Sequence, residues 1–214
     1  MRDMHKQDPH ANQPVLQAGA PIANARLVAI MVHGRGASAE DILGLAQEFS
    51  HRDIAYLAPQ AAANTWYPYS FLMPMEQNEP ALSSALRMIE QLLSQLRAQN
   101  FPPEKVALMG FSQGACLSLE FAARHAQRYA AVAAFSGGLI GPPGTPHDYQ
   151  GSLDATPVFL GCSDVDPHIP VDRVYESADV FAHMGAVVDT RIYPRMGHAI
   201  NQEEIKAVDA LLRP

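Results

Sequence analysis

The 214-residue sequence is poor in several residue types that characterise particular classes of protein. It contains two cysteines, Cys116 and Cys162, which are too few for a disulfide framework or a cysteine-rich metal site. Its 15 Lys and Arg are outnumbered by 22 Asp and Glu, and no dense basic run occurs, so no nucleic-acid partner is expected. No run of about eighteen apolar residues occurs, and we therefore expect no stable membrane insertion.

The first ten residues lack the apolar stretch of a signal peptide, so the expected location is the cytoplasm. Residues 1–12 are polar and show no hydrophobic pattern, which predicts a flexible N-terminal tail. The remainder, 13–214, is long enough for one substantial core and too short for two ordinary domains. One domain is therefore predicted.

Short apolar runs alternate with helical patterns along this domain. Strands are predicted at 14–18, 27–32, 54–57, 106–109, 130–135, 158–161 and 187–193, and helices at 38–51, 80–101, 115–121, 171–184 and from 202. Two pairs, Ser38 with Asp41 and Asn201 with Glu204, resemble capping boxes at helix starts. The alternation predicts an α/β fold, a mostly parallel sheet with helices on both faces.

The pentapeptide Gly110-Phe111-Ser112-Gln113-Gly114 lies between a strand-like run and a helix-like run. It matches G-x-S-x-G, the nucleophile elbow of the α/β-hydrolases, in which a serine stands at a sharp strand-to-helix turn. A side chain at either glycine would collide with the other side of such a turn. The N–H groups that begin the following helix would face an anion formed when the serine attacks. We therefore predict that Ser112 is a nucleophile.

A serine nucleophile requires a base and a carboxylate that orients the base. In α/β-hydrolases the acid and then the histidine follow the serine along the chain. His198 lies between the last predicted strand and the last predicted helix and is the predicted base, with His168 as the alternative. Asp164 and Asp166 share one loop and are both candidates for the acid. Asp164 could cap its own turn, whereas Asp166 precedes a proline that keeps it extended.

Attack on a carbonyl produces an oxyanion, which needs two N–H donors. In this fold they come from the residue after the nucleophile and from a loop after an early strand. The prediction is therefore the backbone N–H groups of Gln113 and of Arg35, the latter within the glycine-flanked loop 33–36. The long segment 58–78 has no clear period, and we expect four of its side chains to line a substrate pocket: Trp66, Tyr67, Phe71 and Met73. Packing of this segment onto the core is the alternative.

Taken in order, these motifs resemble the phospholipase/carboxylesterase family of small α/β-hydrolases, which includes the acyl-protein thioesterases. The matching features are the Gly-Phe-Ser-Gln-Gly elbow, His33-Gly34-x-Gly36, Asp166-Pro167-x-x-Pro170, Gly197-His198 and Trp66. The resemblance implies that Asp166, rather than Asp164, is the acid of a triad with Ser112 and His198. Arg35 stands where the thioesterases carry leucine, and the His-Gly-Arg-Gly form is more similar to bacterial carboxylesterases of the family.

The expected function is that of a serine carboxylesterase, which hydrolyses short- to medium-chain carboxylic esters through an acyl-enzyme. Alternatives are a lysophospholipase or acyl-(protein) thioesterase and, more distantly, a catalytically silent binding protein on the same fold. No H-E-x-x-H, paired Cys-x-x-Cys or phosphate-cradling glycine loop is present, so we expect neither a metal nor a cofactor. The expected partner is a small-molecule ester, and a homodimer is the assembly to be tested.

Overall fold

A seven-stranded sheet forms the centre of the computed structural model, which describes residues 8–213. Its strands lie in the order β1-β3-β2-β4-β5-β6-β7, and the pairs are parallel except for the antiparallel pair of β1 with β3 at one edge. The strands are β1 (Val15–Gly19), β2 (Leu27–Val32), β3 (Ile54–Pro59), β4 (Val106–Phe111), β5 (Ala131–Phe135), β6 (Pro157–Ser163) and β7 (Val187–Tyr193). All seven predicted strands are confirmed.

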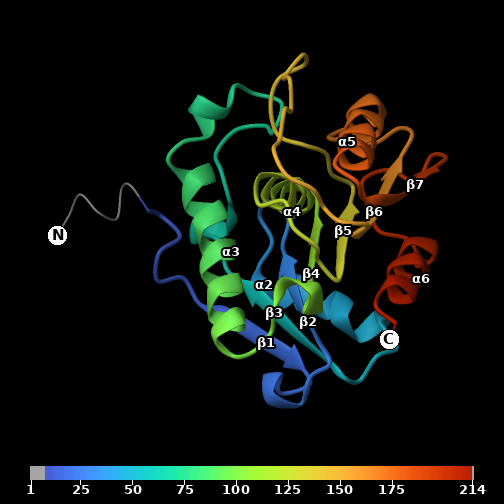
Figure 1. Cartoon of the computed structure of the whole chain (residues 1–214). Coiled ribbons are helices and arrows are strands. Elements are labelled where there is room, and N and C mark those ends of the chain that lie inside the picture. Colours follow the sequence, from blue (N-terminus) through green and yellow to red (C-terminus); the bar gives the residue numbers. More distant parts are fainter. Residues whose placement is uncertain (1–7, 214) are drawn as a thin grey trace.

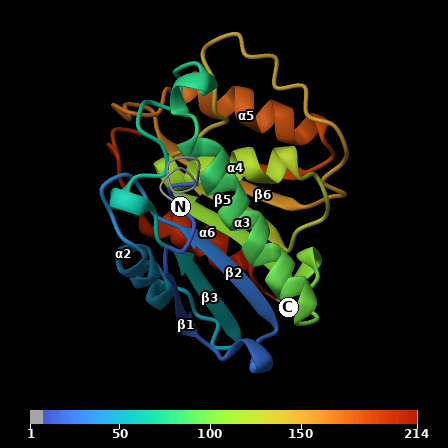
Figure 2. The same ribbon diagram turned by 90° about the vertical axis from the view of Figure 1, so that its left-hand side faces the viewer.

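Helices cover both faces of the sheet (Figures 1 and 2). One face carries α3 (Ala81–Ala98), α4 (Gln113–Arg124) and α5 (Val171–His183), whose apolar residues share a buried cluster with the sheet. The other face carries α2 (Ala39–Gly44) and α6 (Gln202–Leu211), which pack in a second cluster. This arrangement confirms the expected single α/β domain.

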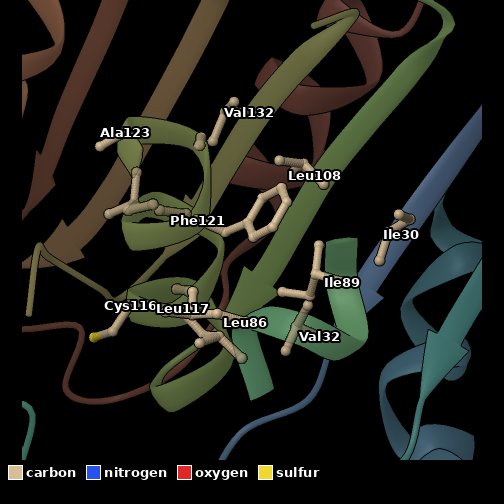
Figure 3. Close-up of a cluster of buried hydrophobic side chains, with 14 of the residues drawn as sticks. Ile30, Val32, Leu86, Ile89, Leu108, Cys116, Leu117, Phe121, Ala123 and Val132 are labelled. Atoms are coloured by element: carbon tan, nitrogen blue, oxygen red, sulfur yellow. The ribbon is translucent and has the colours of Figure 1, made fainter. Parts of the chain in front are cut away.

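The central strands read as continuous apolar runs because both of their faces are buried. Figure 3 shows Ile30 of β2 and Leu108 of β4 beside the side chains of the covering helices. Leu86 and Ile89 of α3 and Phe121 of α4 close this layer, and none of these side chains is more than 7% exposed. The four- and three-residue spacing of the apolar residues in α3 places them on the one face that meets the sheet.

The helix predicted over 38–51 is shorter in the structure. It starts with the predicted capping box, in which the Ser38 hydroxyl accepts from the N–H of Asp41 and the Asp41 carboxylate accepts from the N–H of Ser38. The α-helix ends at Gly44, and a 3₁₀ turn (Leu45–Glu48) follows. Glycine has low helix propensity, and this explains why the periodic pattern does not continue as one regular helix.

Part of the predicted N-terminal tail packs onto the domain. Residues 1–7 lie outside the described residues, but His10 is buried, and its imidazole bonds to the carbonyl of Trp66 (2.9 Å) and the N–H of Ala62 (3.0 Å). The backbone N–H of His10 donates to the Ser84 hydroxyl. The prediction of a loose tail is therefore wrong for residues 8–12, because these hydrogen bonds hold the segment against the loop that follows β3.

The parallel strands end together at one edge of the sheet. Val32 of β2 pairs with Gly110 of β4, and Ser163 of β6 pairs with Tyr193 of β7. The loops that follow these four strands therefore emerge side by side, which is where open α/β sheets place their sites. Within residues 8–213, no helix has the length and apolar character needed to cross a membrane.

Candidate active site

Ser112 occupies the turn between β4 and α4 with φ 55° and ψ −119°, a conformation that non-glycine residues rarely adopt. The two glycines make the turn possible. A Cβ on Gly110 would lie 2.4 Å from the carbonyl group of Gly114, and a Cβ on Gly114 would lie 2.0 Å from the carbonyl oxygen of Val32. The expected close approach within the turn is therefore present at Gly110, whereas Gly114 is required because the start of α4 lies against the end of β2.

The structure brings the three predicted side chains into one chain of hydrogen bonds. The Ser112 hydroxyl lies 2.8 Å from Nε2 of His198, and Nδ1 of His198 lies 2.7 Å from Oδ2 of Asp166. An ionised carboxylate can only accept, so Nδ1 donates to Asp166 and Nε2 is left to accept the serine proton. This arrangement gives the imidazole the tautomer that a base needs.

Asp166 is held as a carboxylate by several donors. Its other oxygen, Oδ1, accepts from the backbone N–H groups of His168 (2.8 Å) and Ile169 (3.1 Å). Burial opposes its ionisation, but the hydrogen bonds from His198 and from these two N–H groups outweigh burial and lower the pKa of Asp166. Asp164 instead accepts the N–H of Arg195 (2.7 Å) and closes the neighbouring turn.

Two backbone N–H groups beside Ser112 have no acceptor among residues 8–213, and they belong to Arg35 and Gln113. The loop that carries Arg35 is fixed through the buried His33. Its Nε2 accepts from the N–H of Ala61 (3.1 Å), and its Nδ1 therefore donates to the carbonyl of Gly34 (2.8 Å). Burial lowers the pKa of His33, in keeping with a neutral ring. The two free donors are available to a negatively charged oxygen at the serine.

A cavity of about 470 Å³ opens at Ser112, within the range of small-molecule sites. Tyr67 and Phe71, two of the four predicted pocket residues, line it, and His168 lies edge-on to His198 at its rim. The full lining is Gly34, Arg35, Ala37, Tyr67, Pro68, Tyr69, Ser70, Phe71, Phe111, Ser112, Gln113, Cys116, His168, Ile169 and His198.

Trp66 and Met73 do not line the cavity, so their prediction as pocket residues is wrong. Trp66 is completely buried behind the wall, where its indole N–H donates to the carbonyl of His33 (2.9 Å). Met73 lies on the surface, 37% exposed. Neighbouring positions of an irregular loop point in different directions, and the sequence carries no period that would tell them apart.

Two side-chain roles were not predicted from the sequence. Gln113 accepts the N–H of Trp66 on Oε1 (2.9 Å) and donates from Nε2 to the carbonyl of Tyr67 (2.8 Å), which fixes the cavity wall to α4. The Arg35 guanidinium donates to the carbonyls of Pro68 (2.8 Å) and Tyr69 (2.6 Å). Both residues were predicted only as backbone N–H donors to the oxyanion, and nothing in the sequence indicated what their side chains contact.

The described part of the chain holds no group of three or more His, Cys, Asp or Glu side chains that could bind a metal ion. Both cysteines are buried and free. Cys116 lines the cavity, and burial raises the pKa of its thiol to about 12, so it is a weak nucleophile there.

Several known proteins are similar to this chain. Acyl-protein thioesterase 1 of Saccharomyces cerevisiae is 24% identical over 220 residues, which cover 92% of this chain and 96% of that protein. Acyl-protein thioesterase 1 of Gibberella zeae is 31% identical over 130 residues, 59% of this chain, and the match spans about half (55%) of that protein. The crystal structure of a phospholipase/carboxylesterase from Dyadobacter fermentans is 41% identical, with a TM-score of 0.91, and the match covers 94% of this chain and 97% of that one.

Residues 15–213 match the sequence model described as Phospholipase/Carboxylesterase. This match covers nearly the whole α/β domain, including the Ser112 elbow and the loops that carry Asp166 and His198. The chain therefore belongs to the phospholipase/carboxylesterase family.

Proposed function

We propose that the protein hydrolyses carboxylic esters through a covalent acyl-enzyme, with Ser112 as nucleophile, His198 as base and Asp166 as the acid that orients the base. The observation that carries the proposal is the unbroken chain of hydrogen bonds from Ser112 through His198 to Asp166 at the wall of a cavity. Short- to medium-chain acyl groups fit a cavity of this size.

In the first step, the Ser112 oxygen attacks the ester carbonyl carbon while its proton passes to Nε2 of His198. The carbonyl oxygen becomes an oxyanion, and the free N–H groups of Arg35 and Gln113 donate to it. Asp166 stays ionised, because its pKa is lowered, and it stabilises the imidazolium that forms.

The intermediate then collapses, and the imidazolium gives its proton to the alkoxide, which leaves as an alcohol. The acyl group remains on Ser112. Water attacks this acyl-enzyme with His198 again accepting a proton, and the second tetrahedral intermediate releases a carboxylic acid and free Ser112. Ser112, His198 and Asp166 are regenerated, so the cycle consumes only the ester and one water molecule.

Titration with a chromogenic organophosphonate tests the proposal directly. We expect one equivalent to label Ser112, and no labelling after Ser112→Ala. Ser112→Ala and His198→Ala should each lower kcat for an ester by about 10³-fold or more, and the double variant should lose little beyond either single variant. Absence of labelling in the unmodified protein would favour the silent binding protein, and additive losses would show that the two residues do not act together.

Thioester hydrolysis is a second candidate, supported by the similarity to proteins named acyl-protein thioesterase 1. The same serine chemistry cleaves either bond, so the comparison needs an oxygen ester and a thioester with the same acyl group. A higher kcat/KM for the oxygen ester supports the carboxylesterase, and the opposite order supports the thioesterase.

A further inference from the structure

Arg35 places a permanent positive charge in the cavity of an acidic protein. The chain has a net charge of −7, yet no Asp or Glu is among the residues that line the cavity. The other polar lining residues are neutral or histidine. Among residues 8–213, Arg35 is therefore the one lining side chain that is charged at every working pH.

The guanidinium is held in place without being neutralised. It donates one N–H to the carbonyl of Pro68 (2.8 Å) and one to the carbonyl of Tyr69 (2.6 Å), and it lies over the Tyr67 ring at 6.0 Å from the ring centre. Carbonyl oxygens orient a cation but carry no net charge. No carboxylate pairs with Arg35 among residues 8–213.

An arginine has five N–H donors, so Arg35 keeps three that these carbonyls do not use. The side chain is exposed at the cavity, and the remaining donors can be reached by a bound molecule. A planar guanidinium pairs best with a carboxylate or phosphate, whose two oxygens match its fork. A fixed and unpaired guanidinium beside Ser112 is thus preorganised for an anion.

We propose that Arg35 selects esters that carry an anionic group, with a carboxylate as the simplest case. The inference rests on the proposed ester hydrolysis and names the class of substrate. The cation would bind the charged end of the molecule while its ester carbonyl lies against Ser112. If Arg35 only ties the loop 33–36 to residues 68–69, its substitution would lower kcat/KM for charged and neutral esters by the same factor.

Two pairs of esters of matched length test the inference. Ethyl hexanoate and monoethyl adipate differ by a carboxylate on the acyl side, and butyl acetate and 4-acetoxybutanoate differ by a carboxylate on the alcohol side. Arg35→Gln removes the charge, and Arg35→Lys keeps the charge but loses the planar fork. Arg52→Gln is the control, since Arg52 is an exposed arginine outside this cavity.

We expect a higher kcat/KM for the anionic ester of at least one pair, and Arg35→Gln should reduce this preference about tenfold or more. Arg35→Lys should retain much of this preference, and Arg52→Gln should leave it unchanged. Added salt should reduce the ratio of kcat/KM between the anionic and the neutral ester. If Arg35→Gln does not fold, Arg35→Met replaces it as the variant that removes the charge, and the same loss of preference is expected. The inference is overturned by a lack of anionic preference in both pairs, or by equal losses on the charged and neutral esters.

Failure of the role proposed for Arg35 can be distinguished from failure of the proposed ester hydrolysis. Hydrolysis of the neutral esters without any charge preference would leave the proposed function intact and remove the role of Arg35. If no ester of either pair is hydrolysed, the proposed function fails, and calorimetric binding of monoethyl adipate then tests Arg35 separately. Binding about tenfold weaker in Arg35→Gln supports the anion site, and equal binding rules it out.

Discussion

At the scale of single residues, the two aspartates of one loop have different environments. Asp166 contacts the imidazole of His198 with one oxygen and two backbone N–H groups with the other. Asp164 accepts one backbone N–H at the surface of the neighbouring turn. Of these two aspartates, only Asp166 contacts the imidazole, so the proposed mechanism predicts that substitutions at the two positions differ sharply in their effect on kcat.

Asp166→Asn should lower kcat by up to ~10⁴-fold, because the amide presents the wrong hydrogen-bonding partner to Nδ1 of His198. Asp164→Asn keeps an oxygen that can accept the N–H of Arg195, so it should change kcat by less than about tenfold. Steady-state kinetics on both variants, with circular dichroism as the folding control, checks this ranking. The reverse ranking would transfer the orienting role to Asp164.

Residue identity was predictable where a local motif determines geometry. Gly110 is required by its contact with Gly114, four residues along the chain, whereas Gly114 is required by its close approach to Val32 of the neighbouring strand β2. The G-x-S-x-G motif, between a strand pattern and a helix pattern, was still sufficient to find the turn. The choice between Asp164 and Asp166 was not local, because it depends on how a loop near residue 166 meets one near residue 198. The residues of the loop alone did not decide between Asp164 and Asp166. The family resemblance favoured Asp166, which lies beside His198 in the structure.

At the scale of secondary-structure elements, the start of α6 contains an unusual carboxyl group. The Glu204 side chain completes the predicted capping box by accepting the N–H of Asn201 (2.8 Å). Its other oxygen is buried against Gly161 of β6 and has no hydrogen-bond partner among the described residues. Burial, opposed by the hydrogen bond from Asn201, raises the pKa of Glu204 to about 7.

A raised pKa in the folded state means that Glu204 stabilises the fold when it is protonated and that this stability is lost as pH rises. The loss begins near the ordinary carboxyl pKa of about 4.5 and is complete above about pH 7. Glu204→Gln keeps the cap acceptor and removes the charge, so it should raise the free energy of unfolding by about 3 kcal/mol at pH 8 and change it little at pH 4.5. Urea denaturation at both pH values measures this.

The exposed neighbour supplies a control for this pH effect. Glu203 lies on the same turn of α6 and is exposed, so Glu203→Gln makes the same substitution outside the buried site and serves as the matched control. An equal stability of the unmodified protein and Glu204→Gln at pH 8 would show that the buried carboxyl is not destabilising when ionised.

The elements themselves were largely predictable, since apolar runs and capping residues are short-range signals. Both capping boxes and all seven strands occur as expected. The end of α2 was not predicted, because the apolar pattern continues past Gly44 while the backbone changes to a 3₁₀ turn. The burial of His10 was not predicted either, because its partners, Trp66, Ala62 and Ser84, are distant in the sequence.

At the scale of the whole molecule, the loops after β2 and β3 form one continuous wall of the cavity. Tyr67 and Phe71 are at most 6% exposed, and Gln113 and Arg35 hold the wall through hydrogen bonds to its backbone. A wall tied at several points should accept short acyl chains and limit long ones. We therefore predict a preference for esters of roughly two to six acyl carbons over longer ones.

Phe71→Ala should move the optimal acyl chain to longer esters, because it removes a large side chain from the cavity wall. Each additional methylene that becomes buried would raise kcat/KM roughly fourfold, from about 0.8 kcal/mol of transfer free energy. A series of p-nitrophenyl esters from two to twelve carbons measures the shift, with Met73→Ala as the control outside the cavity. Best activity on ten-carbon esters in the unmodified protein would instead favour the lipid-hydrolase alternative.

The groups at Ser112 come from four loops spread between residues 34 and 198, and the strands that carry them pair through parallel crossovers. No short contiguous stretch of the chain can assemble this constellation, and β4 must pair with β2 before the loop that carries Arg35 can lie beside Ser112. Parallel pairings of this kind form slowly, because loops must close before their contacts stabilise them. Return of ester hydrolysis after dilution from denaturant would therefore report the assembly of the sheet with its loops, and it should be no faster than the recovery of far-ultraviolet circular dichroism.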